Sequence, residues 1–595
     1  MKQPASLYTG IAGTVFLSML VYLLLRAWYV APMHDEVATF LHFIECGHIW
    51  DDQTLPDANN HLLNSYLGRG VYEVFGMNFF LFRLPSVLAF GLYFWAARKL
   101  TMSFPKEHVG FLVFIALLTI PWITDYFSYT RGYAMAIAFF LAALVHILRF
   151  VQKKRLRSLI IAFSLLWLCV FANFTYLVSA LLLVGYLGLT VLVFWRTWTG
   201  KQRFILALLF ALFAACLLPF IAYSFDLKAA GALYYGSLDG LWWVTGKTLS
   251  RYVLFYDADW LRYVYVAGGL LAMIGAYFML RKSSFKALFE QPFVQWAFLI
   301  LGNLAAILFL AKVMQVNYPE DRAAMYLVPL SILASGYLIS TFPFGKYAGY
   351  LFLFFPITFL LQLNLNTSVF SPDDRMTNAF YDAVKAELDP NDAVAVYPIM
   401  QLTWSLHERQ HAGTPHIGQP MKGYFPQFNV ILTKNTILKT SKDYPDYEVF
   451  AQDSASTYIA LKRKKPLKKS RLFEKTTDHY SGSDEYIVLL QDSVHKEWKN
   501  RMVAIDIDAQ LTSPKHMNTL NIVCTTEDAN GKPTRFHYQN VRWYVGENAV
   551  HYKLHFPVAE NELNDGDKVL KVYLWNPEKR KIDVRNGRVR INALN

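Results

Sequence analysis

The sequence is short of charge, of cysteine and of internal repetition. Charged residues make up 17% of the 595 positions and hydrophobic residues 54%, and the mean hydropathy is +0.25. This balance excludes an ordinary soluble protein. The four cysteines have no paired spacing, which argues against a disulfide framework and a zinc site; they are Cys46, Cys169, Cys216 and Cys524. The sequence contains no internal repeat, whereas two repeated halves are typical of transporters.

The residues that are present divide the chain into two halves. Leu, Phe, Ala and Tyr dominate up to about residue 366, and Asp, Lys, Asn and Glu are common beyond it. A membrane domain followed by a soluble domain explains this change. Much of the net charge of +13 lies in short loops between apolar stretches. Membrane topology therefore explains the charge, and no nucleic-acid partner is expected.

A membrane-spanning helix needs about 20 mostly apolar residues, and the sequence contains about eleven such stretches. The first runs from roughly Leu7 to Val30 and is longer than the core of a cleavable signal peptide. No small-residue cleavage site follows it, so we expect a retained anchor. The other spans are predicted near 79–98, 108–124, 132–149, 158–172, 174–195, 204–224, 263–280, 293–312, 324–341 and 347–364.

Basic residues predict the orientation of these spans. They gather in loops on one side, at 98–106, 149–157, 196–203 and 281–286. Such loops are expected to be cytoplasmic. The loops that contain Asp35, Asp125, Asp239 and Asp321 then face outward. We therefore expect a protein of the bacterial inner or plasma membrane, with a cytoplasmic N-terminus and an extracytoplasmic C-terminal region.

The first outer loop, about 30–78, carries polar groups at the membrane edge. Asp35 and Glu36 follow the first span closely, and Asn59-Asn60-His61 comes soon after. Charges at this boundary are costly to desolvate, so they usually have a partner or a function. Apolar residues at helical spacing follow each polar cluster, which predicts two amphipathic helices lying in the interface. Such helices would hold the polar groups where a lipid headgroup emerges.

The remainder predicts two outer domains. A helix over 376–388 and strands over 393–397, 430–432, 458–461 and 486–490 indicate an α/β domain at 367–495. Alternating segments at 503–507, 520–525, 541–544, 551–556, 568–575 and 589–591 indicate a β-sandwich, of jelly-roll type, at 496–595. Such folds often bind carbohydrate, but a packing or interaction role is equally open.

Several motifs stand in a set order along the membrane domain, 1–366. They are Asp35-Glu36 after the first span, Asn60-His61-Leu62-Leu63, Arg83-Leu84-Pro85-Ser86 at the second span, Ser128-Tyr129-Thr130-Arg131-Gly132-Tyr133 at the fourth, and Tyr318-Pro319-Glu320-Asp321-Arg322 before Tyr326-Leu327-Val328-Pro329. In their order, spacing and sidedness they resemble the GT-C class of integral-membrane glycosyltransferases. The similarity is to the superfamily of protein O-mannosyltransferases and lipid A aminoarabinose transferases.

The resemblance implies transfer of a sugar from a polyprenyl-phosphate donor to a lipid, glycan or protein acceptor at the outer membrane face. A carboxylate can deprotonate the acceptor, so Asp35 is the candidate general base. Glu36 would assist it, or the pair would hold a divalent cation; no cofactor is certain. The departing lipid phosphate needs positive charge, for which guanidinium groups are suited. Arg131 and Arg322 are the candidates for this role.

Other residues have smaller predicted roles. Tyr129 and Tyr318 are candidate hydrogen-bond donors to the donor phosphate, and Lys312 is a further phosphate candidate. His61 would bind the donor phosphate or the acceptor, with Asn60 orienting it.

Each assignment has a purely structural alternative. The acidic pair and the Asn60-His61 pair could cap helices. Arg131 could extend from its span to the membrane interface, and Arg322 could pair with a neighbouring carboxylate. At the level of the whole chain, a transporter or flippase of lipid-linked sugars and a non-catalytic membrane scaffold remain alternatives to an enzyme.

Overall fold

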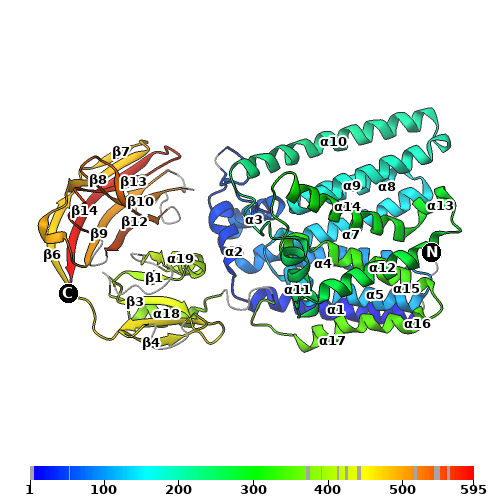
Figure 1. Cartoon of the computed structure of the whole chain (residues 1–595), viewed down its shortest axis with the longest axis horizontal. Coiled ribbons are helices and arrows are strands. Elements are labelled where there is room, and N and C mark those ends of the chain that lie inside the picture. The colour runs from blue at the N-terminus through cyan, green and yellow to red at the C-terminus, as the bar shows by residue number, and fades with distance from the viewer. Residues whose placement is uncertain are drawn as a thin grey trace. The chain divides into compact units, whose positions relative to one another are not determined.

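A computed structural model describes residues 6–52, 54–369, 375–389, 392–411, 415–421, 427–437, 444–514, 519–541, 550–558 and 563–595. The chain forms two compact units. Unit 1 comprises Met1–Val30 and Pro56–Phe370, and unit 2 comprises Ala31–Leu55 and Ser371–Asn595. Unit 1 is helical, and most of the regular structure of unit 2 is strand (Figure 1).

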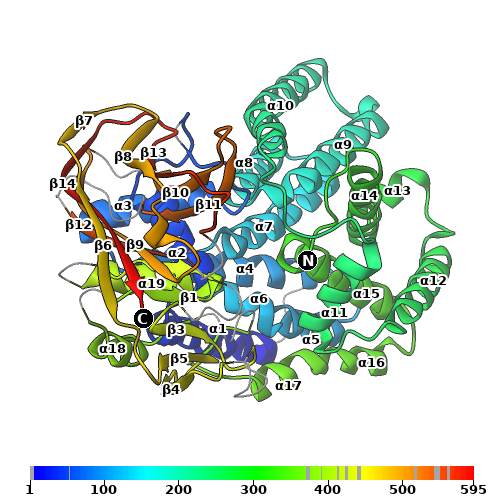
Figure 2. The same ribbon diagram turned by 60° about the vertical axis from the view of Figure 1, so that its left-hand side comes forward.

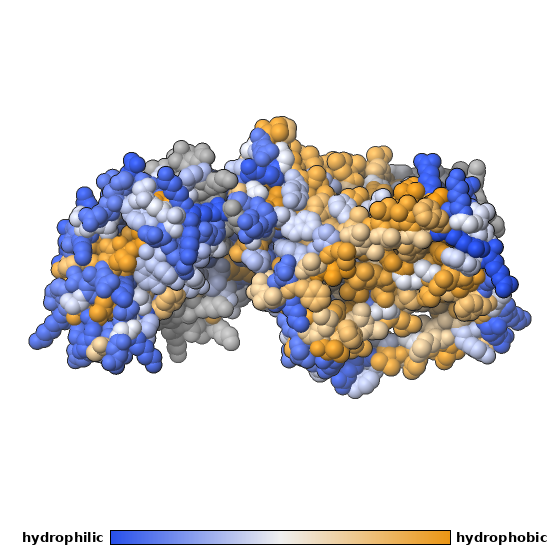
Figure 3. Space-filling view, turned by 90° about the horizontal axis from the view of Figure 1, so that it is seen from above, coloured by the Kyte–Doolittle hydropathy of each residue, from blue (hydrophilic) through white to orange (hydrophobic). Residues whose placement is uncertain are grey.

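Unit 1 contains a set of mostly apolar helices. The longer ones are α1 (Ser6–Tyr29), α3 (Leu62–Phe75), α4 (Phe79–Thr101), α5 (Glu107–Leu118), α7 (Gly132–Lys153), α8 (Leu156–Ala172), α9 (Leu177–Val193), α10 (Gly200–Ala229), α12 (Leu261–Leu280), α14 (Pro292–Lys312) and α15 (Leu327–Thr341). The shorter ones are α6 (Pro121–Asp125), α11 (Lys247–Leu254), α13 (Phe285–Glu290), α16 (Gly345–Ala348) and α17 (Phe354–Leu361). Hydrophobic residues cover much of the helical unit in Figure 3.

The length and composition of these helices confirm the predicted membrane domain. Among the described residues, seven helices are long and apolar enough to cross a membrane. A bent pair, Glu107–Leu118 with Pro121–Ser128, is an eighth candidate, and three shorter apolar helices occupy Leu156–Ala172, Leu327–Thr341 and Gly345–Leu361. Every predicted span thus corresponds to an apolar helix or to this bent pair.

Two of these helices place the polar residues of unit 1. Helix α7 is the most enclosed of the candidate spans, since 83% of its most apolar stretch of 18 residues is buried. It packs on α4 and α8. The bent pair turns by 54° just before α7 begins. Pro121 starts its second arm, where the missing backbone N–H of proline costs no helical hydrogen bond. The motif residues 128–133 begin at the last residue of the second arm, Ser128.

The first outer loop is divided between the two units. Helix α2 (His34–Thr39) and the π-helical turn Phe40–Ile44 belong to unit 2, whereas α3 belongs to unit 1. Arg409 forms an ion pair with Glu45 at 3.0 Å, and a ring nitrogen of His34 lies 2.9 Å from the carbonyl of Ile399. A membrane domain continuous over 1–366 is therefore wrong at residues 31–55, because these contacts group the segment with the C-terminal region.

The first part of unit 2 is an α/β layer, as predicted. Its sheet has the order β2-β1-β3-β5-β4, with β1 parallel to β2 and β3. The strands are β1 (Val394–Val396), β2 (Gly418–Pro420), β3 (Val430–Lys434), β4 (Tyr447–Gln452) and β5 (Tyr458–Arg463). Side chains of α18 (Asn378–Ala386) and α19 (Gln401–Gln410) pack into one core with β1, β3 and β5.

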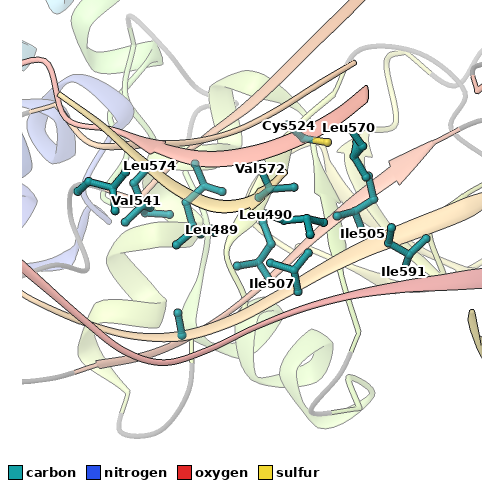
Figure 4. Packing of buried hydrophobic residues seen from close by; sticks show 14 of the residues in the cluster. Leu489, Leu490, Ile505, Ile507, Cys524, Val541, Leu570, Val572, Leu574 and Ile591 are labelled. Carbon is teal, nitrogen blue, oxygen red and sulfur yellow. The ribbon is translucent and has the colours of Figure 1, made fainter. Parts of the chain in front are cut away.

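The second part of unit 2 is a β-sandwich, visible in Figure 2. Its sheets have the orders β11-β10-β13-β8 and β12-β9-β14-β6. The strands are β6 (Lys469–Thr476), β7 (Tyr480–Gly482), β8 (Tyr486–Ser493), β9 (Val503–Thr512), β10 (Asn521–Glu527), β11 (Pro533–Asn540), β12 (Val550–Val558), β13 (Val569–Trp575) and β14 (Ile582–Leu594). Buried residues of both sheets, among them Leu490, Ile507 and Val572, meet between them (Figure 4).

Strand pairing corrects the boundary predicted near residue 495. Strand β8 is the strand predicted at 486–490, but it pairs with β13 of the sandwich and not with the α/β sheet. Strands β6 and β7 likewise pair with β14. The sandwich therefore begins before residue 496, because β6 and β8 are edge strands of its two sheets and pair with β14 and β13. Most of the strand predicted at 541–544 lies outside the described residues.

Candidate functional site

Arg26 is the centre of one buried polar network in unit 1. Its side chain lies in the last turn of α1 and pairs with the carboxylate of Asp125. It also donates to the carbonyl oxygens of Asn364, at 2.6 Å, and Thr367, at 2.9 Å. Both members of the ion pair have side chains only 1% exposed. The network thus joins the end of α1 to the bent helix pair and to the segment 364–367.

The carboxylate of Asp125 is fully engaged. It accepts hydrogen bonds from the hydroxyls of Tyr129 and Ser368, each at 3.0 Å, and from the backbone N–H of Val369 at 2.7 Å. A buried ion pair is tolerated when its remaining donors and acceptors are satisfied. Sequence reasoning missed this pair. The signal available was Arg26 inside an otherwise apolar span, since an ionisable residue there needs a partner.

Tyr129 belongs to this network. Its hydroxyl donates to Asp125 and accepts a hydrogen bond from Arg26 at 2.9 Å. The guanidinium of Arg83 lies 5.7 Å from the centre of its ring and donates to the carbonyl oxygens of Ala27 and Val30. Arg83 therefore fixes the C-terminal end of α1. The structure therefore places Tyr129 in the Arg26 network, where its hydroxyl donates a hydrogen bond to the Asp125 carboxylate.

A second buried cluster surrounds Arg131, the residue that caps the N-terminus of α7. Arg131 donates to the side-chain oxygen of Asn59, and its guanidinium lies 5.8 Å from the centre of the Tyr133 ring. The rings of His61 and Tyr133 meet edge to face at 4.6 Å. Arg131 and His61 are buried. The structure therefore brings two predicted site residues, far apart in sequence, to one tyrosine.

The backbone around Arg131 is closely packed. An ideal Cβ on Gly132 would lie 2.8 Å from Cβ of His61 and 1.9 Å from the carbonyl oxygen of Ala172. Position 132 therefore requires glycine. Asn60, the other predicted residue, accepts a hydrogen bond from Ser65 at 2.9 Å. This contact ties the Asn60 side chain to the first turn of α3, whose N-cap residue is His61.

The late loop brings Arg322 close to a tyrosine. Its guanidinium lies 4.8 Å from the centre of the Tyr235 ring, and the Tyr235 hydroxyl donates to Asp321 at 2.6 Å. Burial raises the pKa of Tyr235 well above its usual range, and the charge of Arg322 opposes that rise. Arg322 thus lies against a tyrosine whose hydroxyl is bound by the neighbouring carboxylate.

The two remaining phosphate candidates differ in exposure. Tyr318 is buried, and its backbone N–H donates to the carbonyl oxygen of Ser237 at 2.9 Å. Lys312 is exposed in the last turn of α14.

Glu320 lies in the late loop, two positions before Arg322. Burial, and after it the neighbouring Asp321, raises the pKa of Glu320.

The acidic pair lies in the first turn of α2, in unit 2. Glu36 is fully buried, and its carboxylate accepts a hydrogen bond from the backbone N–H of Met33 at 3.3 Å. This is the contact expected of a helix-capping carboxylate. Asp35 is half-buried. Within the described parts of the chain, no group of three or more His, Cys, Asp or Glu residues is arranged to hold a metal ion.

Comparison with known proteins gives structural similarity without sequence matches. A scan against protein-family models and a search of curated proteins find no match. Among solved structures, ArnT from Cupriavidus metallidurans bound to undecaprenyl phosphate is similar at 12% identity, over 77% of this chain and 98% of ArnT, with a TM-score of 0.37. All the structures named here are GT-C glycosyltransferases, the class that the sequence motifs resemble.

Two further structures are similar over different lengths. Arabinosyltransferase EmbB from Mycobacterium smegmatis is 11% identical over 100% of this chain and 66% of EmbB, with a TM-score of 0.32. An Archaeoglobus fulgidus oligosaccharyltransferase tethered to an acceptor peptide is 14% identical over 69% of this chain and 61% of that chain, with a TM-score of 0.36.

Proposed function

We propose that this chain is an integral-membrane glycosyltransferase that moves a sugar from a polyprenyl-phosphate donor to a lipid, glycan or protein acceptor. The observation that carries the proposal is the cluster of Arg131, His61 and Tyr133 at the N-terminus of α7. An arginine at this position adds its charge to the positive end of a long helix. That combination suits a phosphate group at the end of a lipid.

The reaction requires charge stabilisation on the leaving side. As the bond from the anomeric carbon breaks, negative charge grows on the lipid phosphate, and planar guanidinium groups can bind it through two hydrogen bonds. In the proposal Arg131 is the principal ligand and Arg322 the second, with Lys312 and Tyr318 in smaller roles. His61 contacts the donor phosphate or the acceptor. Tyr129 is left out because its hydroxyl already donates a hydrogen bond to Asp125.

The attacking side requires a base. Asp35 is the proposed general base, because it is half-buried whereas Glu36 is fully buried and caps α2. Glu36 would assist by fixing the turn that carries Asp35. A divalent cation held by this pair remains part of the proposal. We further propose the bacterial inner or plasma membrane as its location, with a cytoplasmic N-terminus and unit 2 outside.

Two other functions are compatible with the same fold. A transporter of lipid-linked sugars would need ionisable groups that exchange partners within the membrane. The ion pair of Arg26 and Asp125 is instead fixed by three backbone groups, which favours the enzyme. A scaffold without catalytic activity would leave the Arg131 cluster without a chemical role.

The test is transfer of labelled sugar from a polyprenyl-phosphate donor in membranes that contain the full chain. Asp35→Asn should lower kcat by about 100-fold or more, because a general base contributes that much. The matched control is Asp51→Asn, which removes a 44% exposed carboxylate from the same segment of unit 2. If Asp35→Asn folds normally and transfers as fast as the parent, the assigned base is wrong. Sugar export without formation of a glycosidic bond would support the transporter.

A further inference from the structure

The sheet β11-β10-β13-β8 has an outward face rich in aromatic side chains. Strand register arranges twelve residues of this face in three rows across the four strands. The rows are Phe536, Thr525, Lys571 and Gln491; Tyr538, Val523, Tyr573 and Val488; and Asn540, Asn521, Trp575 and Tyr486. We refer to these twelve residues as the aromatic face. The residues between them, such as Cys524, Val572 and Leu574, point into the core (Figure 4).

The aromatic face is exposed to an unusual degree for large side chains. The exposed fraction is 60% for Tyr538, 57% for Tyr486 and 53% for Phe536. The rings of Tyr486 and Tyr573 lie 5.8 Å apart, and those of Phe536 and Tyr538 lie 6.1 Å apart. Val523 and Thr525 of β10 are buried between these rings, so the exposed rings form two groups, one on β11 and one on β13 and β8. Exposed apolar groups gathered on one face of a folded domain often mark an interaction site.

The polar groups of the aromatic face indicate what it can bind. Lys571 is the one charged residue among the twelve, and its ammonium group pairs with Glu527 at 2.7 Å. The face therefore offers no net charge to an anionic polymer or a lipid headgroup. Side-chain amides stand beside the rings. Asn521 is 9% exposed, and its side-chain oxygen has no hydrogen-bond partner in the described part of the chain.

We propose that the aromatic face is a binding site for a neutral oligosaccharide. The apolar C–H faces of sugar rings can stack on aromatic rings, as other flat apolar groups do, while sugar hydroxyls can bond to the side chains of Asn521 and Gln491. Neighbouring strands lie about 4.8 Å apart, so four strands span about 14 Å. This width accommodates a chain of a few sugar residues. The proposal does not depend on the proposed transferase activity.

The experiment is calorimetric titration of the purified full chain, in a detergent without a sugar headgroup. The probes are maltohexaose, cellohexaose, mannohexaose and arabinohexaose. We expect saturable binding of at least one probe, and Tyr538→Ala and Tyr486→Ala should each weaken it about five- to ten-fold by removing one stacking ring. Both side chains are exposed, so folding should be preserved. The matched control is Val449→Ala, which alters a 55% exposed side chain on β4 and should bind like the parent.

Three results would overturn the proposal. The first is that none of the four oligosaccharides binds. The second is that binding is unchanged in both tyrosine variants while the control is also unchanged, since the ligand would then lie elsewhere. The third is that the parent self-associates and binds no oligosaccharide while Tyr538→Ala is monomeric, because the aromatic face would then be a protein interface.

Discussion

The two buried arginine clusters of unit 1 differ in what holds the guanidinium. Arg26 donates to backbone carbonyls of Asn364 and Thr367 and pairs with a carboxylate. Arg131 donates to the side-chain amide oxygen of Asn59, and its guanidinium lies over the ring of Tyr133. Backbone acceptors cannot leave without unfolding the segment that carries them. A side-chain acceptor can rotate away when a phosphate arrives.

Burial therefore does not distinguish a structural arginine from a functional one. Both residues are 0% exposed, and both stand near the end of an apolar helix. The partners make the distinction, and variants in the two clusters can break it or sharpen it.

The largest expected effect on stability is that of Asp125→Asn. Removing one charge of a buried pair leaves the other uncompensated, which costs about 3–5 kcal/mol. The measurement is the free energy of unfolding of the purified full chain, with transfer activity per folded molecule expected to stay near that of the parent. The control is Asp257→Asn, whose solvent-exposed pair with Arg251 should contribute little to stability. Equal losses of unfolding free energy in the two variants would show that the Arg26 network does not stabilise the fold.

Arg131→Ala should have the opposite profile. Losing hydrogen bonds to a charged phosphate costs about 1.5–3 kcal/mol, or roughly 10- to 150-fold in kcat/KM for the lipid donor. Arg131→Lys, which keeps the charge without the planar fork, should fall between parent and alanine. Arg69→Ala is the control, because Arg69 forms an exposed pair with Glu73. An alanine variant with normal kcat/KM and normal stability would place the phosphate elsewhere.

Tyr129→Phe tests the border between the clusters. The substitution removes a hydroxyl that donates to Asp125, so we expect a loss of about 1.5 kcal/mol in unfolding free energy and an unchanged KM for the donor. Tyr133→Phe, whose ring contacts His61, is the paired variant. A raised KM for the donor in Tyr129→Phe at normal stability would restore the role that the sequence predicts for this tyrosine.

The sequence predicts the membrane domain well because apolar length is a local property. It also predicts the α/β layer and the sandwich, since alternation and turn residues are local too. It does not predict the division of the first outer loop, which depends on contacts such as that of Glu45 with Arg409 across more than 360 positions. The boundary near 495 is wrong for the same reason, because β8 is completed by β13.

The candidate site is predictable in part. Motif spacing brings Asn60, His61 and Arg131 into consideration, and the structure places His61 and Arg131 against one tyrosine. The same spacing assigns Tyr129 to phosphate because it cannot show that the Tyr129 hydroxyl donates its hydrogen bond to Asp125. The partner of Arg26 lies 99 positions away, so no local pattern predicts their ion pair.

The smallest expected effect concerns Arg322, the third arginine, which stands beside Glu320. Burial and the neighbouring Asp321 raise the pKa of Glu320, so the folded state keeps this proton to higher pH than the unfolded state does. Stability then falls as pH rises from the ordinary carboxyl pKa through the raised one, and the penalty persists above it. Glu320→Gln should therefore raise the melting temperature slightly at neutral pH and not at all below the ordinary pKa. Melting curves of both proteins between pH 4 and 8 test this, with the exposed Glu497→Gln as control. A gain that persisted at the lowest pH would show that the buried charge of Glu320 is not its cause.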